Sequence, residues 1–165
     1  MNQNIKFVWK KFEELSLDDL YAILNLRQKV FVLEQDCPYI DADYSDQNAF
    51  HLLGYEGEKL VAYLRAFAPD IKYQGSSMGR IVVEETMRNQ SLGIEITNIG
   101  KSFLKEKYPN HEIVISAQHR LEEFYKDLGF ISRGGVYFSI ETSKGIILIY
   151  SNYLVQQTKL LLRAS

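Results

Sequence analysis

The stretch GRIVVEETMRNQSLGIEI, residues 79–96, is the most informative part of the chain. An apolar run typical of a β-strand leads into a short polar loop, which opens directly onto a segment with helical spacing of its apolar residues. Main-chain N–H groups in such a loop and at the helix start converge on one point, where the helix dipole favours negative charge. Arg88 adds a cation with several hydrogen-bond donors. The stretch therefore predicts a pyrophosphate site between a strand and a helix.

The loop differs from the two commonest nucleotide-binding motifs. It lacks the Gly-Lys-Ser/Thr of a P-loop and the Gly-x-Gly-x-x-Gly fingerprint of dinucleotide-binding folds. A solvated turn in which Ser91 caps the following helix is the alternative interpretation. The residues of the loop leave both interpretations open.

Strand and helix patterns continue on both sides of this stretch. Apolar runs predict strands at 5–9, 50–55, 60–68, 78–83, 113–117, 136–140 and 146–150. Helical spacing predicts a helix capped by Ser16 with Leu17, Leu20, Leu24 and Phe31 on its apolar face, a second at 92–107, and a third at 121–128 that Gly129 ends. The order β-α-β-β-β-α-β-α-β-β predicts an α/β fold with a single mixed central sheet flanked by helices, and not a doubly wound one.

Two local features predict where the core is densest. Gly100 lies inside the predicted helix at 92–107, where glycine costs about 1 kcal/mol relative to alanine. We therefore expect a neighbouring element to approach the helix closely at Gly100. The near-continuous apolar run at 113–117 is typical of a strand that is covered on both faces.

Composition and charge restrict the class of protein. The 165 residues suffice for one domain without disulfides or metal, and 46% apolar and 24% charged residues are ordinary for a globular protein. A net charge of −2 gives no general attraction to nucleic acid or anionic membrane, but leaves room for a cationic amine as substrate. Cys37 is the only cysteine, which fits a reducing compartment. The N-terminal residues lack the apolar core of a signal peptide, and no run approaches the roughly 20 apolar residues of a membrane helix, so we expect a cytoplasmic protein.

The phosphate loop and its flanking segments resemble the GNAT superfamily of N-acetyltransferases. The run Arg88-Asn89-Gln90-Ser91-Leu92-Gly93 is similar to the Gln/Arg-x-x-Gly-x-Gly/Ala signature that holds the pyrophosphate of coenzyme A in this family. In ISAQHRLEEFYKDLGF, residues 115–130, Tyr125 precedes a Gly-Phe pair as it does in the family. The segment LRQKVFVLEQDCPYIDADYSDQNAFHLLGY, residues 26–55, resembles the ElaA-like branch. The resemblance implies the GNAT fold.

The chain departs from the family pattern at two places. Ser91 stands where the signature has its first glycine, and serine keeps the N–H but resists the positive φ that glycine adopts readily. The resemblance also stops near residue 138. We expect an acetyltransferase domain at 1–150 and an atypical tail at 151–165.

The resemblance implies an N-acetyltransferase that uses acetyl-CoA and in which a neutral primary amine attacks the thioester directly. It implies that Tyr125 is the general acid toward the departing sulfur, with a core tyrosine as the alternative. Glu34 and Glu84 are candidates for the general base, and for Glu34 bracing of the helix end is the alternative. The resemblance further implies that main-chain groups of the third strand hold the pantetheine arm and polarise the carbonyl. The cofactor-binding candidates are Ile81, Val82, Val83, Arg88, Asn89, Gln90, Ser91, Leu92, Gly93 and Gln118.

The acceptor pocket is assigned to polar side chains of the N-terminal half, namely Arg27, Tyr39, Asp43, His51 and Arg65. Ordinary hydrogen bonding between helix, loop and sheet is the alternative for each of them. The expected acceptor is a small-molecule amine or a protein N-terminus, without nucleic acid or membrane partners, and the expected state is a monomer or homodimer. A catalytically silent module that binds coenzyme A or another protein is the alternative function.

No metal site is expected. Asp41, Asp43 and Ser45 begin like a calcium loop, but Asp46 replaces its turn glycine and Leu52 its closing glutamate. The histidines show no spacing typical of metal ligands.

Overall fold

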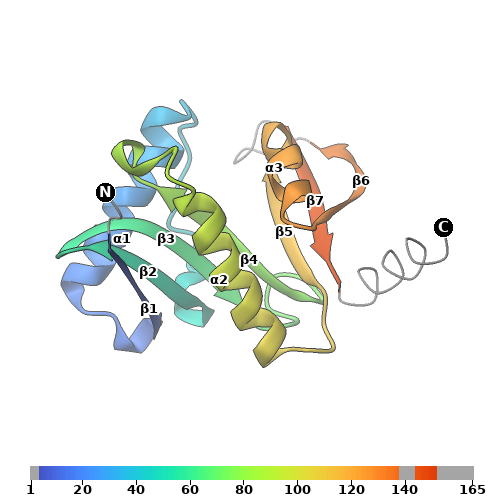
Figure 1. Cartoon of the computed structure of the whole chain (residues 1–165), viewed down its shortest axis with the longest axis horizontal. Helices are drawn as coiled ribbons and strands as arrows, with labels where there is room; N and C mark the ends of the chain where they lie inside the picture. The colour runs from blue at the N-terminus through green and yellow to red at the C-terminus, as the bar shows by residue number, and fades with distance from the viewer. Residues whose placement is uncertain (1–3, 138–143, 152–165) are drawn as a thin grey trace.

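The computed structural model describes residues 4–137 and 144–151, whose strands form one seven-stranded sheet (Figure 1). Along the chain the strands are β1 (Ile5–Lys11), β2 (Phe50–Glu56), β3 (Lys59–Phe67), β4 (Ser76–Val83), β5 (Ile113–Gln118), β6 (Ile131–Tyr137) and β7 (Gly145–Tyr150). In space their order is β1-β2-β3-β4-β5-β7-β6. Strands β4 and β5 are parallel, and the other neighbours are antiparallel.

Helices separate the strands in the predicted order. They are α1 (Leu17–Arg27), a π-helical continuation η2 (Gln28–Glu34), α2 (Leu92–Lys107) and α3 (Glu122–Asp127), with short 3₁₀ turns η1 (Phe12–Glu14), η3 (Asp46–Asn48), η4 (Glu85–Met87) and η5 (His119–Leu121). The predicted α/β class with one mixed sheet is confirmed. Of the expected tail at 151–165, all but Ser151 lies outside the described residues. Among the residues that the structure describes, no helix is long and apolar enough to cross a membrane.

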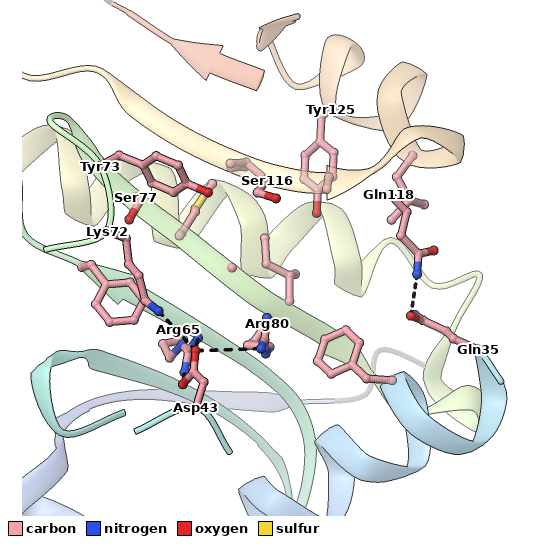
Figure 2. Close-up of a pocket in the computed structure, with 18 of the residues that line it drawn as sticks. Gln35, Asp43, Arg65, Lys72, Tyr73, Ser77, Arg80, Ser116, Gln118 and Tyr125 are labelled. Carbon is pink, nitrogen blue, oxygen red and sulfur yellow. Dashed lines mark hydrogen bonds and ion pairs between the residues drawn. The ribbon is translucent and has the colours of Figure 1, made fainter. Parts of the chain in front are cut away.

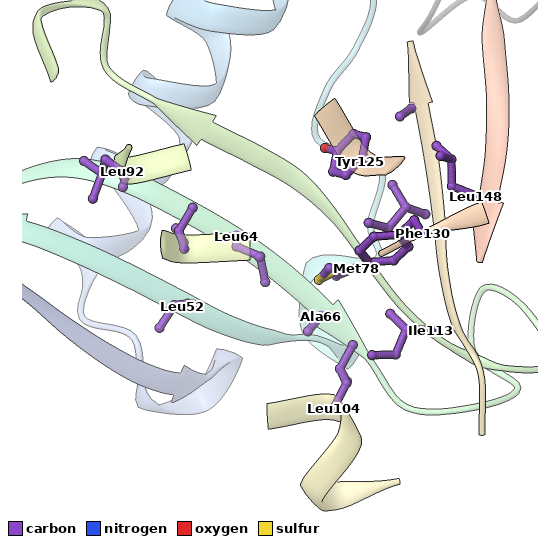
Figure 3. Close-up of a cluster of buried hydrophobic side chains, with 14 of the residues drawn as sticks. Leu52, Leu64, Ala66, Met78, Leu92, Leu104, Ile113, Tyr125, Phe130 and Leu148 are labelled. Atoms are coloured by element: carbon purple, nitrogen blue, oxygen red, sulfur yellow. The ribbon is translucent and has the colours of Figure 1, made fainter. Parts of the chain in front are cut away.

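Strand β3 is buried on both faces because helices cover the sheet from both sides. Its side chains alternate between the faces: Leu64 packs in the cluster that contains Leu104 of α2, whereas Tyr63 packs in the cluster that contains Ile23 of α1. The larger cluster continues across β4, β5 and β7, as Figure 3 shows for Met78, Ile113 and Leu148. This two-sided core fixes the position of the middle of the sheet, where β4 and β5 meet.

The first helix begins as predicted, but a different face of it is buried. The Ser16 hydroxyl accepts a hydrogen bond from the N–H of Asp19 at 3.0 Å, and the Asp19 carboxylate accepts one from the N–H of Ser16 at 3.0 Å. The expected apolar face is wrong at Leu17, which is 86% exposed, while Ile23 and Leu26 are buried. The helix has apolar residues on two sides, and spacing alone does not tell which side meets the sheet.

The second helix is confirmed at the predicted bounds, together with the close approach at Gly100. A Cβ atom at Gly100 would lie 2.7 Å from Cδ1 of Leu64 and 3.1 Å from Sδ of Met78. The absence of a side chain therefore lets α2 sit directly on β3 and β4.

The strand predicted at 136–140 begins earlier in the structure, at Ile131. Strand β6 is at the edge of the sheet, most of its residues are exposed, and its pairing with β7 is interrupted between Arg133 and Tyr137. An edge strand of this composition has no apolar run to identify it. Residues 138–140 of the predicted strand lie outside the described residues.

Candidate active site

Strands β4 and β5 separate after a short paired segment, and a cavity opens between them. They pair only at Ser76 with Ile113 and at Ser77 with Val114. The cavity has a volume of about 200 Å³ and is lined by β3, β4, β5, α3 and the segment that follows α1. Beyond the paired residues, the main chain of β4 that faces β5 has N–H and C=O groups available to a ligand.

A bulge shapes the β4 side of this cavity. The pairing of β3 with β4 shifts register between Tyr63 and Arg65, and Arg80 on β4 has a φ of 51°. A positive φ at a residue with a side chain costs about 1 kcal/mol, and contacts of the Arg80 side chain with Asp41, Tyr39 and Phe31 hold it there. Its Nε donates to Oδ1 of Asp41 at 2.6 Å, and its guanidinium lies 5.7 Å from the ring centroid of Tyr39. Arg80 is not among the site residues predicted from sequence, although a glycine such as Gly79 inside a strand pattern is a signal for a bulge.

The predicted phosphate loop has main-chain amides without partners inside the described part of the chain. Its hydrogen bonds end at Arg88, whose N–H donates to the carbonyl of Glu85, and begin again at Glu95, whose N–H donates to the carbonyl of Ser91. Ser91 has a φ of 60°, the left-handed conformation that glycine would adopt at this position. Its side chain makes no capping hydrogen bond. The amides from Asn89 to Gly93 are therefore left for an anion at the N-terminus of α2.

Arg88 connects this loop to the end of η2. Its Nη2 donates to Oε2 of Glu34 at 2.5 Å, and its Nε donates to the carbonyl of Val83 at 3.1 Å. Both Glu34 and Arg88 line a second cavity, which shares Gln35 and other residues with the first. Ile81, Val82 and Val83 also line this second cavity, so the structure brings the predicted cofactor-binding strand and Arg88 together.

Glu84, the other candidate base, lies away from both cavities. Its Oε2 lies 2.5 Å from Nζ of Lys59, and its N–H donates to the carbonyl of Val61 at 2.8 Å. Neither cavity is lined by Glu84. The structure therefore places this carboxylate in a half-buried ion pair with Lys59, outside the two cavities.

Tyr125 points from α3 into the first cavity (Figure 2). It is 6% exposed, and its ring packs edge-on against Phe124 and Phe130, with centroids 5.1 Å and 5.9 Å away. Burial raises the pKa of its hydroxyl, which therefore stays protonated and can act as a hydrogen-bond donor. The two interpretations of Tyr125 are compatible, because the ring belongs to the core while the side chain lines the cavity.

Gln118 spans the gap between the two sides of the cavity. Its Nε2 donates to Oε1 of Gln35 at 2.7 Å, and its Oε1 accepts from Nε of Arg120 at 2.7 Å. Gln118 ends β5 and Gln35 follows η2, so this hydrogen bond joins the first and second halves of the chain at the cavity (Figure 2).

Charged side chains form the wall opposite Tyr125. Arg65 donates from Nη1 to Oδ1 of Asp43 at 2.7 Å and from Nη2 to Oδ2 at 2.9 Å, and Lys72 donates to the same carboxylate at 3.2 Å. Burial acts to raise the pKa of Asp43, but the hydrogen bonds and charge of Arg65 outweigh it and hold that pKa well below its usual range. Asp43 is therefore an ionised partner of arginine and a weak base. Three of the residues assigned to the acceptor pocket from sequence line this cavity, namely Asp43, Arg65 and Tyr39.

Arg27 and His51, which were also assigned to the acceptor pocket, lie behind this wall and do not line the cavity. Arg27 is 0% exposed and donates to Oδ2 of Asp41 at 2.6 Å and to Oδ1 of Asp46 at 2.8 Å. The ring of His51 bonds the Tyr63 hydroxyl and the Asp46 carbonyl, and burial is the main cause that lowers its pKa. Both residues therefore hold the wall in place through hydrogen bonds. Such a bracing role was the alternative to binding the acceptor. Sequence reasoning missed several residues that line the cavity, among them Lys72, Tyr73, Ser77, Arg80 and Ser116.

Comparison with known proteins agrees with this geometry. Residues 28–139 match a protein-family model described as an acetyltransferase (GNAT) domain. The protein ElaA of Escherichia coli K12 is 36% identical over 126 residues, which cover 75% of this chain and 82% of that protein. The crystal structure of E. coli ElaA superimposes with a TM-score of 0.83 and 32% identity, over 90% of this chain and 100% of that one.

Two other relatives are similarly close. The UPF0039 protein sll0451 of Synechocystis is 37% identical over 134 residues, which cover 81% of this chain and 87% of that protein. The crystal structure of an acyl-CoA N-acyltransferase from Pseudomonas aeruginosa superimposes with a TM-score of 0.83 and 29% identity, over 90% of this chain and 100% of that one.

Proposed function

Because the chain belongs to the GNAT acetyltransferase family, in the branch that contains ElaA, we propose that it transfers an acetyl group from acetyl-CoA to a primary amine. The observation that carries the proposal is the gap between β4 and β5, where Tyr125 lines one cavity and Arg88, at the start of the phosphate loop, lines the adjoining one. The similar protein from P. aeruginosa is named an acyl-CoA N-acyltransferase, which supports an acyl-CoA as donor.

The residues at this gap fit coenzyme A. Ser91 holds the left-handed conformation that the family signature needs, and the amides from Asn89 to Gly93 meet the positive end of the α2 dipole. Arg88 lies beside them and can exchange its contact with Glu34 for a phosphate. On the β4 side, main-chain groups beyond Ser77 that point toward β5 have no strand partner there and can bind the pantetheine amides. Acetyl-CoA would supply the acetyl group as a thioester that is activated toward an amine.

Tyr125 is assigned the role of general acid in this proposal. It lines the cavity, and its raised pKa keeps the proton on the hydroxyl until a stronger base appears. As the nitrogen–carbon bond forms and the carbon–sulfur bond breaks, the hydroxyl gives its proton to the departing sulfur. The ring contacts with Phe124 and Phe130 fix the direction of this hydroxyl.

The proton of the acceptor ammonium leaves to solvent in this scheme. Glu84 is paired with Lys59 outside the cavity, and Glu34 faces the phosphate side with Arg88. Asp43 lines the cavity, but its lowered pKa makes it a poor proton acceptor. The remaining route for this proton is through water at the open mouth of the cavity. That water can relay the proton to Glu34.

Two measurements on the purified protein test the proposal. Isothermal titration with acetyl-CoA should give binding at micromolar concentrations or tighter, and release of free coenzyme A thiol should follow when a panel of amines is added. Binding without turnover over a broad panel would favour the catalytically silent module. Absence of binding would refute the assignment of the loop.

A further inference from the structure

The cavity beside Tyr125 carries more positive than negative charge. Within the described chain, the charged residues that line it are one carboxylate, Asp43, and three cations, Arg65, Lys72 and Arg80. A second ammonium group of a polyamine would meet like charge here, which costs free energy in a partly desolvated site. The overall charge of −2 left room for a cationic acceptor, but the cavity itself favours an anionic group.

The carboxylates behind the wall do not remove this excess, because each is shared between cations. Asp41 accepts from both Arg27 and Arg80, and Asp46 accepts from both Arg27 and Arg65. Asp43 is likewise shared between Arg65 and Lys72. When the buried ion pairs behind the wall are included, the network contains four cations and three carboxylates. They are Arg27, Arg65, Lys72 and Arg80, and Asp41, Asp43 and Asp46. The unbalanced charge lies on the cavity side of the network.

Two buried polar atoms in this wall have no partner among the described residues. They are Oγ of Ser77, a residue that is 2% exposed, and Nε of Arg65, a residue that is 3% exposed. Buried donors are normally satisfied, and leaving one unpaired costs about 1–3 kcal/mol. Ser77 and Lys72 lie on the same side of the cavity, as Figure 2 shows. Both atoms are covered by neighbouring protein atoms, so oxygen atoms of a bound anion can satisfy them only after nearby side chains shift.

We propose that this wall, made of Arg65, Lys72, Arg80 and Ser77, binds a carboxylate of the acceptor, so that the acceptor is an amino acid or a similar aminocarboxylate. The inference rests on the proposed acetyl transfer and names the substrate class of the same site. The carboxylate lies against the cations of β3 and β4, and the amine then faces Tyr125 and β5 across the cavity (Figure 2). Planar guanidinium groups match a carboxylate better than they match a hydroxyl or an apolar group.

Matched acceptors test the proposal through turnover. L-leucine is compared with 3-methylbutylamine, and 4-aminobutanoate with propylamine, so that each pair differs only by the carboxylate. Rates are expressed per neutral amine. Two charged hydrogen bonds between the wall and the acceptor carboxylate raise the expected kcat/KM about a hundredfold. We expect this difference between the better of the two aminocarboxylates and its matched amine. If both amines are acetylated as well as their aminocarboxylates, the carboxylate site is wrong while the transferase function stands.

Binding of the acetylated products tests the site without turnover. In the presence of coenzyme A, calorimetry compares N-acetyl-L-leucine and N-acetyl-4-aminobutanoate with the neutral acetamides of the matched amines. At least one acid should bind about tenfold or more tightly than its acetamide. Equal binding in both pairs overturns the inference. A clear preference for the acid without turnover of any acceptor supports the site and refutes the proposed activity, so the two failures are distinguishable.

A matched pair of lysine variants identifies the wall as the source of the preference. The Lys72 side chain is 36% exposed, and Lys126 on α3 is a lysine of similar exposure, 41%, in a surface ion pair that does not line the cavity. Lys72→Gln should weaken binding of the preferred acid about fivefold, the range of a partly screened ion pair, and leave the neutral acetamide unchanged. Lys126→Gln should change neither. Equal effects of the two variants, or an equal loss for acid and acetamide in Lys72→Gln, would contradict the proposal.

Discussion

The buried arginine behind the cavity wall gives a stability prediction that separates buried from surface ion pairs. Arg27→Met removes a guanidinium that is 0% exposed and donates to Asp41 at 2.6 Å and to Asp46 at 2.8 Å. Breaking a buried ion pair costs 3–5 kcal/mol when a charge remains unpaired. Here Asp41 keeps Arg80 and Asp46 keeps Arg65, so we expect the lower end, about 3 kcal/mol. For a chain of this length, that loss lowers the melting temperature by about 10 °C.

The control is Arg133→Met, which breaks an exposed ion pair of similar length. Nη2 of Arg133 lies 2.8 Å from Oε1 of Glu112, and the two side chains are 55% and 36% exposed. This variant should lose less than about 1 kcal/mol. Urea unfolding followed by circular dichroism at neutral pH measures both free energies. Equal losses in the two variants would refute the claim that burial of the network makes Arg27 important.

The pH dependence of the same variant checks the electrostatic origin of the effect. Burial acts to raise the pKa of Asp46, but Arg27 and Arg65 together lower it below its usual value. A carboxylate with a lowered folded pKa stabilises the protein above its unfolded pKa, near 3.9, and this contribution is lost as the pH falls through the folded pKa. The difference between wild type and Arg27→Met should therefore be full at pH 7 and shrink below about pH 4. A difference that stays constant over this range would show that lost packing, and not charge, causes the destabilisation.

Two further substitutions test the catalytic cavity and the phosphate loop. Tyr125→Phe keeps the ring contacts with Phe124 and Phe130, so acetyl-CoA should bind as before while kcat in a thiol-release assay falls about a hundredfold; an unchanged kcat would remove Tyr125 from the chemistry. Ser91→Gly relieves a φ of 60° that costs a serine about 1 kcal/mol, so urea unfolding should show a gain of up to about 1 kcal/mol with acetyl-CoA binding retained. A less stable Ser91→Gly variant would contradict the account of the loop.

The fold was predictable from sequence because its strong signals are local. The apolar runs of β2 to β5, the cap at Ser16 and the glycine inside α2 each report on their own surroundings, and all three are confirmed. The errors occur where the signal is not local. Whether Leu17 or Ile23 faces the sheet depends on partners far along the chain, and edge strand β6 has few apolar residues to mark it.

The local geometry of the predicted phosphate loop could be derived from sequence, whereas the pairing of charges in the predicted acceptor wall could not. The loop from Arg88 to Gly93 is continuous in sequence, so its geometry follows from one strand-to-helix junction. The acceptor wall joins residues that are 22 to 39 positions apart, such as Asp43 with Arg65 and Asp41 with Arg80. A sequence shows that these residues are charged but not which of them pair, so it could not separate Arg27, which is buried, from Arg80, which lines the cavity.

The buried network and the cavity wall share the same carboxylates, which links stability to substrate choice. Asp41 and Asp46 each bind one arginine of the buried layer and one arginine of the cavity, so neither cavity arginine can reorient without breaking a buried ion pair. A wall held in this way is rigid before the substrate arrives, and an anionic group that binds it pays little for ordering side chains. Substitutions that change the acceptor class should therefore be tolerated at Lys72, whose ammonium contacts Asp43 and the ring of Phe67 and no carboxylate of the buried layer among the described residues, before they are tolerated at Arg65 or Arg80.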